Sequence, residues 1–311
     1  MIVRWGLDEL PALAGARPFV VASPRWRHLL DSADRWEEVP SHRIEVPEGV
    51  DTIVAVGGGS AIDTAKAASA ASGLPLVSVP TTYSGAEWTA FFGVRDPDRK
   101  MRGGGAGANL HAIVYEPKLT LDLPIAVTVG TALNALAHAA EALYVRERTP
   151  ESDVDALEAA RLIGEWLPRV VERPGDLKAR TELLRGACHA GAALGGSMLA
   201  LGHAMAQALG GRYGAPHGAL NALTLPPALR FNHAVAQEAI ARFAGALGSP
   251  DPAARLEELA RLGGFERLRD LGVSEEELSE VAAAVSERPG AKANPRPVTP
   301  ADVEELLRSI W

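Results

Sequence analysis

The spacing of apolar positions along the chain changes near residue 120. Before that point, short apolar runs at Pro18–Ser23, Thr52–Val56 and Leu74–Val79 fit strands that are buried on both faces. A helix is expected from about Ala61 to Ala71, between the second and third of these runs. Strands that alternate with helices predict a parallel, doubly wound α/β sheet with right-handed crossovers.

From Leu123 onward the pattern is helical, because apolar residues recur three and four positions apart and no strand pattern is visible. The long helical stretches are 131–146, 152–172, 178–211 and 234–247. We therefore expect an α/β domain over residues 1–122 and an all-helical domain over residues 123–311, with the boundary near Pro117–Pro124.

The segment His42–Val46 has a strand-like composition, but only Pro47–Asp51 separates it from the next predicted strand. Parallel neighbours need a crossover of about a dozen residues or more. The segment is therefore an antiparallel strand, an edge piece or no strand.

Composition and charge exclude several classes of protein. The chain of 311 residues has 31 Lys and Arg against 39 Asp and Glu, a net charge of −8, which is the wrong sign for binding nucleic acid or anionic lipid. A single cysteine, Cys188, excludes an internal disulfide framework and fits a reducing cytoplasm. The N-terminus has no apolar signal core, so a cytoplasmic location is expected. The uncharged run Gly186–Gly202 contains His189 and falls short of a membrane span, which favours a buried helix.

A glycine-rich turn follows the second predicted strand, in the sequence VAVGGGSAIDTAK at Val54–Lys66. Glycines let the backbone approach a pyrophosphate closely, and the N-terminus of the following helix offers free N–H groups and the positive end of the helix dipole. Ser60 is the expected N-cap. The motif is neither G-x-G-x-x-G nor a P-loop, and a plain strand–helix turn is the alternative.

A second polar turn, Pro80–Thr89, follows the next predicted strand. Ligands of open α/β sheets lie outside the carboxyl ends of the strands, so the hydroxyls of Thr81, Thr82 and Tyr83 are candidates for contacting whatever the glycine turn holds. A hydroxyl-rich surface loop is the alternative.

The helical part of the sequence contains three histidines in apolar, glycine-rich surroundings. They are His138, which follows Asn134 by one helical turn and precedes Glu141, then His203 and His217. A single such histidine is more often a hydrogen-bonded core residue. Three histidines with an aspartate would indicate iron or zinc. Asn134 supplies a neutral amide instead, which should weaken a divalent site.

These motifs together resemble the iron-containing alcohol dehydrogenase superfamily, and more narrowly its maleylacetate reductase branch. The resemblance runs from about Gly6 to Trp311 and rests on GGGSAIDTAK, PTTYSGAEWT, NALAHAAEALY, LGHAMAQALGGRYGAPHGALNALTLP and NPRPVT. It implies a dinucleotide-binding domain, a helical domain and an active site in the cleft between them. It also implies positions for cofactor contacts: Gly58, Gly59, Ser60 and Asp63 at the phosphates, Thr81 and Thr82 along the pyrophosphate and nicotinamide, and Lys100 near a ribose.

The resemblance further implies the reaction. Metal-using branches carry aspartate where Asn134 stands, whereas maleylacetate reductases are similar to this chain in having asparagine, and in having Tyr83, and they need no metal. The implied activity, part of aromatic compound catabolism, is hydride transfer from NADH or NADPH to the conjugated double bond of a keto-diacid, giving 3-oxoadipate. The catalytic candidates for stabilising or protonating the enolate are His138, His203, His217 and Tyr83.

Asn134 and Arg296 are candidates for contacting the substrate, and a solvated loop arginine is the alternative for Arg296. A homodimer that binds a small molecule, and neither nucleic acid nor membrane, is also implied. Cofactor choice is open, because the first predicted strand ends Ala22-Ser23-Pro24 without the carboxylate that grips a ribose 2′-hydroxyl. The resemblance favours NADH.

Two other functions remain open. One is an alcohol or polyol dehydrogenase that holds iron or zinc through the three histidines. The other is a cofactor-binding protein without turnover, suggested by two departures from the family pattern. The family commonly has a second histidine where this chain has Gln207, and this chain lacks about one helix before Thr52.

Overall fold

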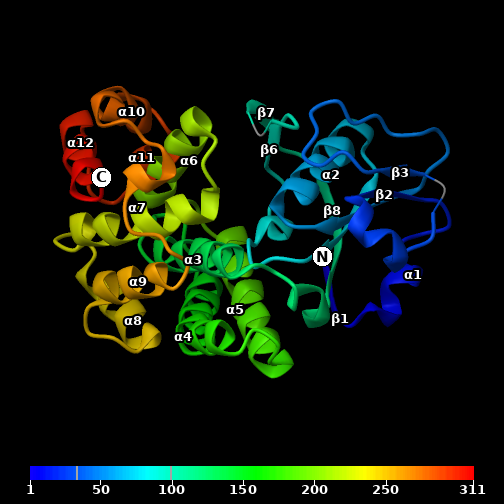
Figure 1. Cartoon of the computed structure of the whole chain (residues 1–311), viewed down its shortest axis with the longest axis horizontal. Helices are drawn as coiled ribbons and strands as arrows, with labels where there is room; N and C mark the ends of the chain where they lie inside the picture. The colour runs from blue at the N-terminus through cyan, green and yellow to red at the C-terminus, as the bar shows by residue number, and fades with distance from the viewer. Residues whose placement is uncertain (33, 99) are drawn as a thin grey trace. The chain divides into compact units, whose positions relative to one another are not determined.

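The computed structural model describes residues 1–32, 34–98 and 100–311, which form two compact units, Met1–Asp122 and Leu123–Trp311 (Figure 1). The strands all lie in the first unit: β1 (Ile2–Trp5), β2 (Pro18–Ala22), β3 (Arg35–Trp36), β4 (Thr52–Gly57), β5 (Pro75–Pro80), β6 (Phe92–Arg95), β7 (Met101–Gly105) and β8 (Asn109–Tyr115). Its helices are α1 (Leu10–Leu13) and α2 (Gly59–Ser72), with short 3₁₀ turns η1 (Leu7–Glu9), η2 (Pro24–Leu29), η3 (Ala86–Trp88) and η4 (Pro117–Thr120).

Six of the described strands form one parallel sheet in the order β1-β8-β5-β4-β2-β3. Val20 of β2 pairs with Val54 of β4, which pairs with Val77 of β5, so the three strands predicted from the sequence lie side by side. The expected parallel α/β fold is confirmed. Strands β1, β3 and β8 were not predicted, because β1 and β3 are short and only half-buried and β8 begins with polar residues.

Apolar side chains of the central strands alternate between two buried clusters, one on each face of the sheet. Val54 and Val56 of β4 belong to one cluster, whereas Ile53 and Ala55 belong to the other, which packs against α2. This alternation explains why the strands are continuous apolar runs in the sequence.

The connection from β3 to β4 contains no helix. Val39, Ile44 and Val46 of this coil pack against the α2-side cluster and cover the part of the sheet that a crossover helix would cover. Segment His42–Val46 is therefore not a strand, one of the three alternatives that the sequence left open.

Strands β6 and β7 form a separate antiparallel pair, in which Val94 lies opposite Gly103. The sequence did not predict this hairpin, because β7 reads MRGGG and has no alternation of apolar and polar residues.

The second unit is helical throughout, as predicted, and contains no strand in residues 123–311 (Figure 1). Its helices are α3 (Ile125–Ala142), α4 (Pro150–Glu172), α5 (Leu177–Gly195), α6 (Leu201–Tyr213), α7 (His217–Asn232), α8 (Gln237–Leu247), α9 (Pro252–Arg261), α10 (Leu278–Ser286), α11 (Pro289–Ala293) and α12 (Pro300–Ser309), with η5 (Leu268–Leu271) and η6 (Glu275–Glu277). None of the helices described is both long and apolar enough to span a membrane.

The structure differs from the predicted helices in two respects: one long predicted stretch is broken, and one helix was not predicted. The stretch 178–211 is broken after Gly195, so Gly186–Gly202 is not one buried helix but the end of α5, a short coil and the start of α6. Helix α7 was not predicted, because Pro226 and Pro227 lie inside it. Nearly all of its side chains from Ala219 to Asn232 are buried, so tertiary packing overrides the cost of the prolines.

Helices α3 and α7 pack with their backbones in close contact. A Cβ atom built on Gly218 would lie 2.5 Å from the carbonyl carbon and oxygen of Gly130, so Gly218 has no room for a methyl group. Because the obstructing atoms belong to the backbone, the contact can be relieved only by moving one helix.

We expect Gly218→Ala to destabilise the protein by about 3 kcal/mol, the upper end of the cost of overpacking a core. Gly245→Ala is the matched control, because Gly245 is exposed on α8 and a Cβ there would meet nothing within 4 Å. That change should stabilise the protein by about 0.5–1 kcal/mol. Denaturant unfolding of the two variants measures both effects, and equal midpoints would contradict the α3–α7 contact.

Candidate active site

The glycine turn lies between β4 and α2. Gly58 is the N-cap of α2, and its carbonyl oxygen accepts the N–H of Ile62 at 3.2 Å, so the helix begins at Gly59. The expectation that Ser60 is the N-cap was wrong, since Ser60 already lies inside the first helical turn. Its carbonyl accepts the hydroxyl of Thr64 at 2.8 Å.

The hydroxyl loop after β5 lies against this turn. A Cβ on Gly58 would be 2.8 Å from Cγ2 of Thr82, and the Thr81 N–H donates to the carbonyl of Gly57 at 3.0 Å. Oγ1 of Thr82 is buried and has no hydrogen-bond partner among the described residues. A glycine-lined helix N-terminus beside an unsatisfied hydroxyl donor fits a pyrophosphate group.

Asp63 holds the β6–β7 hairpin against α2. Its carboxylate lies 3.3 Å from Nζ of Lys66 and accepts the N–H of Gly93 at 3.3 Å. Lys66 is almost fully buried and also donates to Oγ1 of Thr89 and the carbonyl of Phe91. Burial lowers the pKa of Lys66, while the nearby Asp63 opposes that shift. Contact of Asp63 with cofactor phosphates stays a prediction.

Two other candidates of the first unit lie in different environments. Lys100 is exposed beside the hairpin turn, where its backbone N–H donates to Oδ1 of Asp96 at 2.8 Å. Tyr83 is fully buried in the loop after β5. Their roles in cofactor binding and proton donation stay predictions.

The three histidines of the second unit form one cluster. The rings of His138 and His203 stack with centroids 4.7 Å apart and planes 12° apart, and His217 lies 5.9 Å from His203. His138 and His203 are buried, whereas His217 is half-buried. Burial lowers the pKa of His138 well below its usual range, and the other two histidines add to the shift. His138 is therefore neutral near pH 7.

Asn221 connects this cluster to Asn134. Its Nδ2 lies 2.7 Å from Oδ1 of Asn134 and 3.0 Å from Nε2 of His217. An amide nitrogen carries two donors and no acceptor, so both partners must accept, and the proton of a neutral His217 lies on Nδ1. His203 differs, because its Nδ1 lies 2.7 Å from the carboxylate of Glu141.

Hydrogen bonds within this donor set compete with the binding of a divalent metal ion. Oδ1 of Asn134 and Nε2 of His217, two atoms that would face an ion, both accept hydrogen bonds from Asn221. The one carboxylate of the group, Glu141, is bonded to His203 Nδ1. Among the residues that the structure describes, no three His, Cys, Asp or Glu side chains are arranged to hold a metal.

Arg296 lies apart from the histidines. Its guanidinium stacks 3.9 Å from the ring centre of Phe231 and donates to the Phe231 carbonyl at 3.0 Å. Phe231 is near the end of α7 and His217 is its first residue, about 21 Å away along an ideal helix. The structure thus does not bring the predicted Arg296 together with the cluster.

Sequence reasoning missed the roles of Glu141 and Asn221. A signal for Asn221 was present, because His217 and Asn221 are one turn apart on α7, just as Asn134 and His138 are on α3. Two such pairs on separate helices are what a shared polar cluster requires.

Comparison with known proteins places this geometry in a family. The model of the Fe-containing alcohol dehydrogenase C-terminal region matches residues 128–311, and that of iron-containing alcohol dehydrogenase matches residues 43–115. The chain belongs to the iron-containing alcohol dehydrogenase family. It falls in the maleylacetate reductase branch, as the sequence indicated, and is an NAD(P)-dependent oxidoreductase that acts on small molecules.

Individual relatives agree over nearly the whole chain. A maleylacetate reductase of Burkholderia cepacia is 40% identical over 305 residues, which cover 98% of this chain and 85% of that protein. A solved putative alcohol dehydrogenase from Ralstonia eutropha JMP134 has a TM-score of 0.89 and 33% identity, covering 100% of this chain and 95% of that one. A maleylacetate reductase structure from Agrobacterium tumefaciens has a TM-score of 0.88 and 28% identity, with coverage of 100% and 95%.

We expect Asn221→Leu to cost about 2–4 kcal/mol of stability, because it removes the amide that donates to the buried Oδ1 of Asn134 and to Nε2 of His217. Asn232→Leu is the matched control. Asn232 is also buried on α7 and forms a reciprocal amide pair with Asn294, at 2.8 and 2.7 Å. Both variants should unfold at a lower denaturant concentration than the wild-type protein, but only Asn221→Leu should lower kcat, by about tenfold or more. Equal kcat values would contradict a role for Asn221 in ordering the cluster.

Proposed function

We propose that the protein is a maleylacetate reductase that needs no metal ion. The observation that most supports this proposal is the hydrogen bond from the amide of Asn221 to the amide oxygen of Asn134, at 2.7 Å. By the resemblance, the metal-using branches have a carboxylate at the position of Asn134. The printed names of the relatives support the substrate. Metal independence is an inference from these contacts. It differs from what the name of the family, iron-containing alcohol dehydrogenase, indicates.

The proposed reaction adds two electrons and two hydrogens across a carbon–carbon double bond. The glycine turn would hold a dinucleotide, which would supply a hydride to one alkene carbon and leave negative charge on the neighbouring carbonyl oxygen. The histidine cluster stabilises that enolate. A proton delivered to the other alkene carbon completes 3-oxoadipate. Because burial lowers the pKa of His138, its ring is neutral and would act on the enolate by hydrogen bonding.

We expect purified protein to oxidise NADH in the presence of maleylacetate and to keep its kcat after exhaustive treatment with EDTA. Asn134→Asp should lower kcat for maleylacetate by about tenfold or more, because a carboxylate opposes the charge of the enolate. The same variant should retain more zinc or iron in metal analysis, because it restores a carboxylate ligand.

Other outcomes of this experiment identify the alternatives. Stoichiometric metal in the wild-type protein, with activity lost on its removal and regained on its return, would indicate a metal-dependent alcohol or polyol dehydrogenase. Binding of NADH without turnover of any enone or aldehyde would indicate a cofactor-binding protein.

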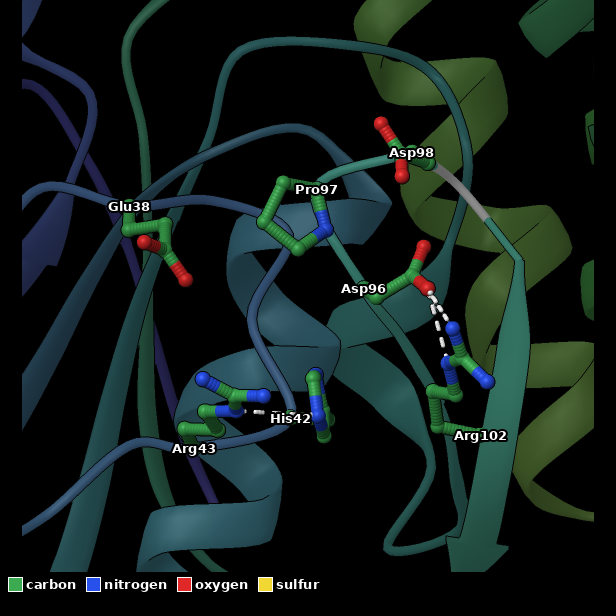
Figure 2. Close-up of a pocket in the computed structure, with 7 residues that line it drawn as sticks. All are labelled: Glu38, His42, Arg43, Asp96, Pro97, Asp98 and Arg102. Atoms are coloured by element: carbon green, nitrogen blue, oxygen red, sulfur yellow. Dashed lines mark hydrogen bonds and ion pairs between the residues drawn. The ribbon is translucent and has the colours of Figure 1, made fainter.

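We infer that the first unit accepts NADPH as well as NADH. The strand β2 ends at Ala22 and is followed by Ser23, so no carboxylate stands there to repel a 2′-phosphate. A pocket of about 520 Å³ lies near α2, lined by Glu38, His42, Arg43, Asp96, Pro97, Asp98 and Arg102 (Figure 2). Its two walls are bonded to the first turns of α2, through Ser41 to Thr64 at 3.2 Å and through Gly93 to Asp63 at 3.3 Å.

The two arginines of this pocket differ in their partners. Arg102 is held by Asp96 at 2.5 Å, whereas Arg43 contacts His42 at 3.3 Å and, among the described residues, has no carboxylate within 4 Å (Figure 2). A guanidinium without an anionic partner suits a phosphate. Glu38 lines the same pocket and suits the 2′-hydroxyl of NADH.

We expect Arg43→Gln to raise KM for NADPH on the order of tenfold, the loss of one phosphate contact, and to leave KM for NADH within about twofold. Arg4→Gln is the control, because Arg4 lies on β1, the opposite edge strand of the sheet. Steady-state kinetics with both cofactors measures the effect. Equal changes for NADH and NADPH would rule out Arg43 as the selective contact.

A homodimer and a cytoplasmic location stay predictions from the sequence.

A further inference from the structure

Glu141 is a fully buried carboxylate that receives three donors. It lies on α3 and accepts the Ala200 N–H at 2.7 Å, the His203 N–H at 3.2 Å and Nδ1 of His203 at 2.7 Å. Ala200 is the N-cap of α6 and its methyl side chain cannot accept a hydrogen bond, so Glu141 caps α6 from a neighbouring helix.

The start of α6 is shaped around this carboxylate. A Cβ on Gly202 would lie 2.9 Å from Oε1 of Glu141, so a larger residue there would push the carboxylate away. The hydroxyl of Thr224 on α7 donates to the Gly202 carbonyl at 2.9 Å and fixes the same turn from the other side. The turn that carries His203 is therefore held by two neighbouring helices.

These contacts decide which nitrogen of His203 faces the cluster. A carboxylate only accepts, so Nδ1 of His203 must carry a proton, and in the neutral ring Nε2 has the free lone pair. Nε2 is buried and has no hydrogen-bond partner among the described residues. The titratable groups around this ring are Glu141 and His138 on α3 and His217 on α7.

We propose that Glu141 is a positioning residue that holds His203 with Nδ1 toward its carboxylate and with Nε2 directed at the reacting substrate. Under the proposed function, on which this step rests, protonated Nε2 of His203 gives its proton to the enolate, and the ring returns to its neutral form. His203 is the ring assigned this role because its Nδ1 lies 2.7 Å from the carboxylate of Glu141.

Three variants separate this role from simple capping of α6. Glu141→Gln keeps the side-chain shape and removes the charge, Glu141→Asp keeps the charge with a shorter reach, and Thr224→Val loosens the start of α6 without touching Glu141 or His203. We expect Glu141→Gln to lower kcat about a hundredfold, the range of a general acid, with the Kd for NADH within about twofold. Glu141→Asp should retain more kcat than Glu141→Gln although it is no more stable. Thr224→Val should lower the melting temperature and should lower kcat much less than Glu141→Gln does.

A capping role alone would make kcat follow melting temperature across all three variants, and that result would overturn the proposal.

The wild-type protein tests the same idea without any variant. Nitrogen-15 chemical shifts of His203 should show a proton on Nδ1 and a free Nε2 at high pH, and the opposite tautomer would overturn the proposal. The kinetic arms use whichever enone or aldehyde the wild-type protein reduces. Lack of turnover with maleylacetate therefore counts against the proposed function, whereas unchanged kcat in Glu141→Gln counts against the role of Glu141.

Discussion

The site of the second unit depends on how closely α3 packs against α7. Gly130 and Gly218 bring the two backbones together, and the contact leaves no space for a Cβ on Gly218. The polar residues follow one and two turns later along α3, as Asn134 and His138, and at His217 and Asn221 on α7. The hydrogen bond of 2.7 Å between Asn221 and Asn134 is a consequence of that spacing. A shift of one helix by the width of a methyl group would break it.

Burial makes these polar contacts obligatory. Asn134, Glu141 and Asn221 are almost completely removed from solvent, and a buried polar group without a partner costs more than a typical hydrogen bond contributes. The cluster is therefore ordered by the need to satisfy its donors and acceptors. Two ring nitrogens of the cluster, Nε2 of His203 and Nδ1 of His138, are buried and have no hydrogen-bond partner within the part of the chain that the structure describes.

The sequence predicted the parts of the fold that local patterns encode. Apolar runs marked β2, β4 and β5, and helical spacing marked most of the second unit, because these features depend on near neighbours. It did not predict α7, where long-range packing overrides two prolines, or the β6–β7 hairpin, whose glycines carry no pattern. Within the candidate site, the sequence identified the three histidines by their apolar, glycine-rich surroundings. The pairing of Glu141 with α6 was not identified, because it joins residues 59 positions apart.

The same reasoning explains why one amide at position 134 changes the chemistry of the cluster. Nε2 of His217 has a single lone pair, and Asn221 uses both of its amide protons to engage that lone pair and Oδ1 of Asn134. An ion could enter only if both hydrogen bonds broke and a buried amide lost both acceptors. An aspartate at position 134 would alter that balance, since its charge attracts a cation and its second oxygen can accept from Asn221 while the first binds the ion. Asn134 and the Asn221 bridge therefore place hydrogen bonds on the two atoms that an ion would need.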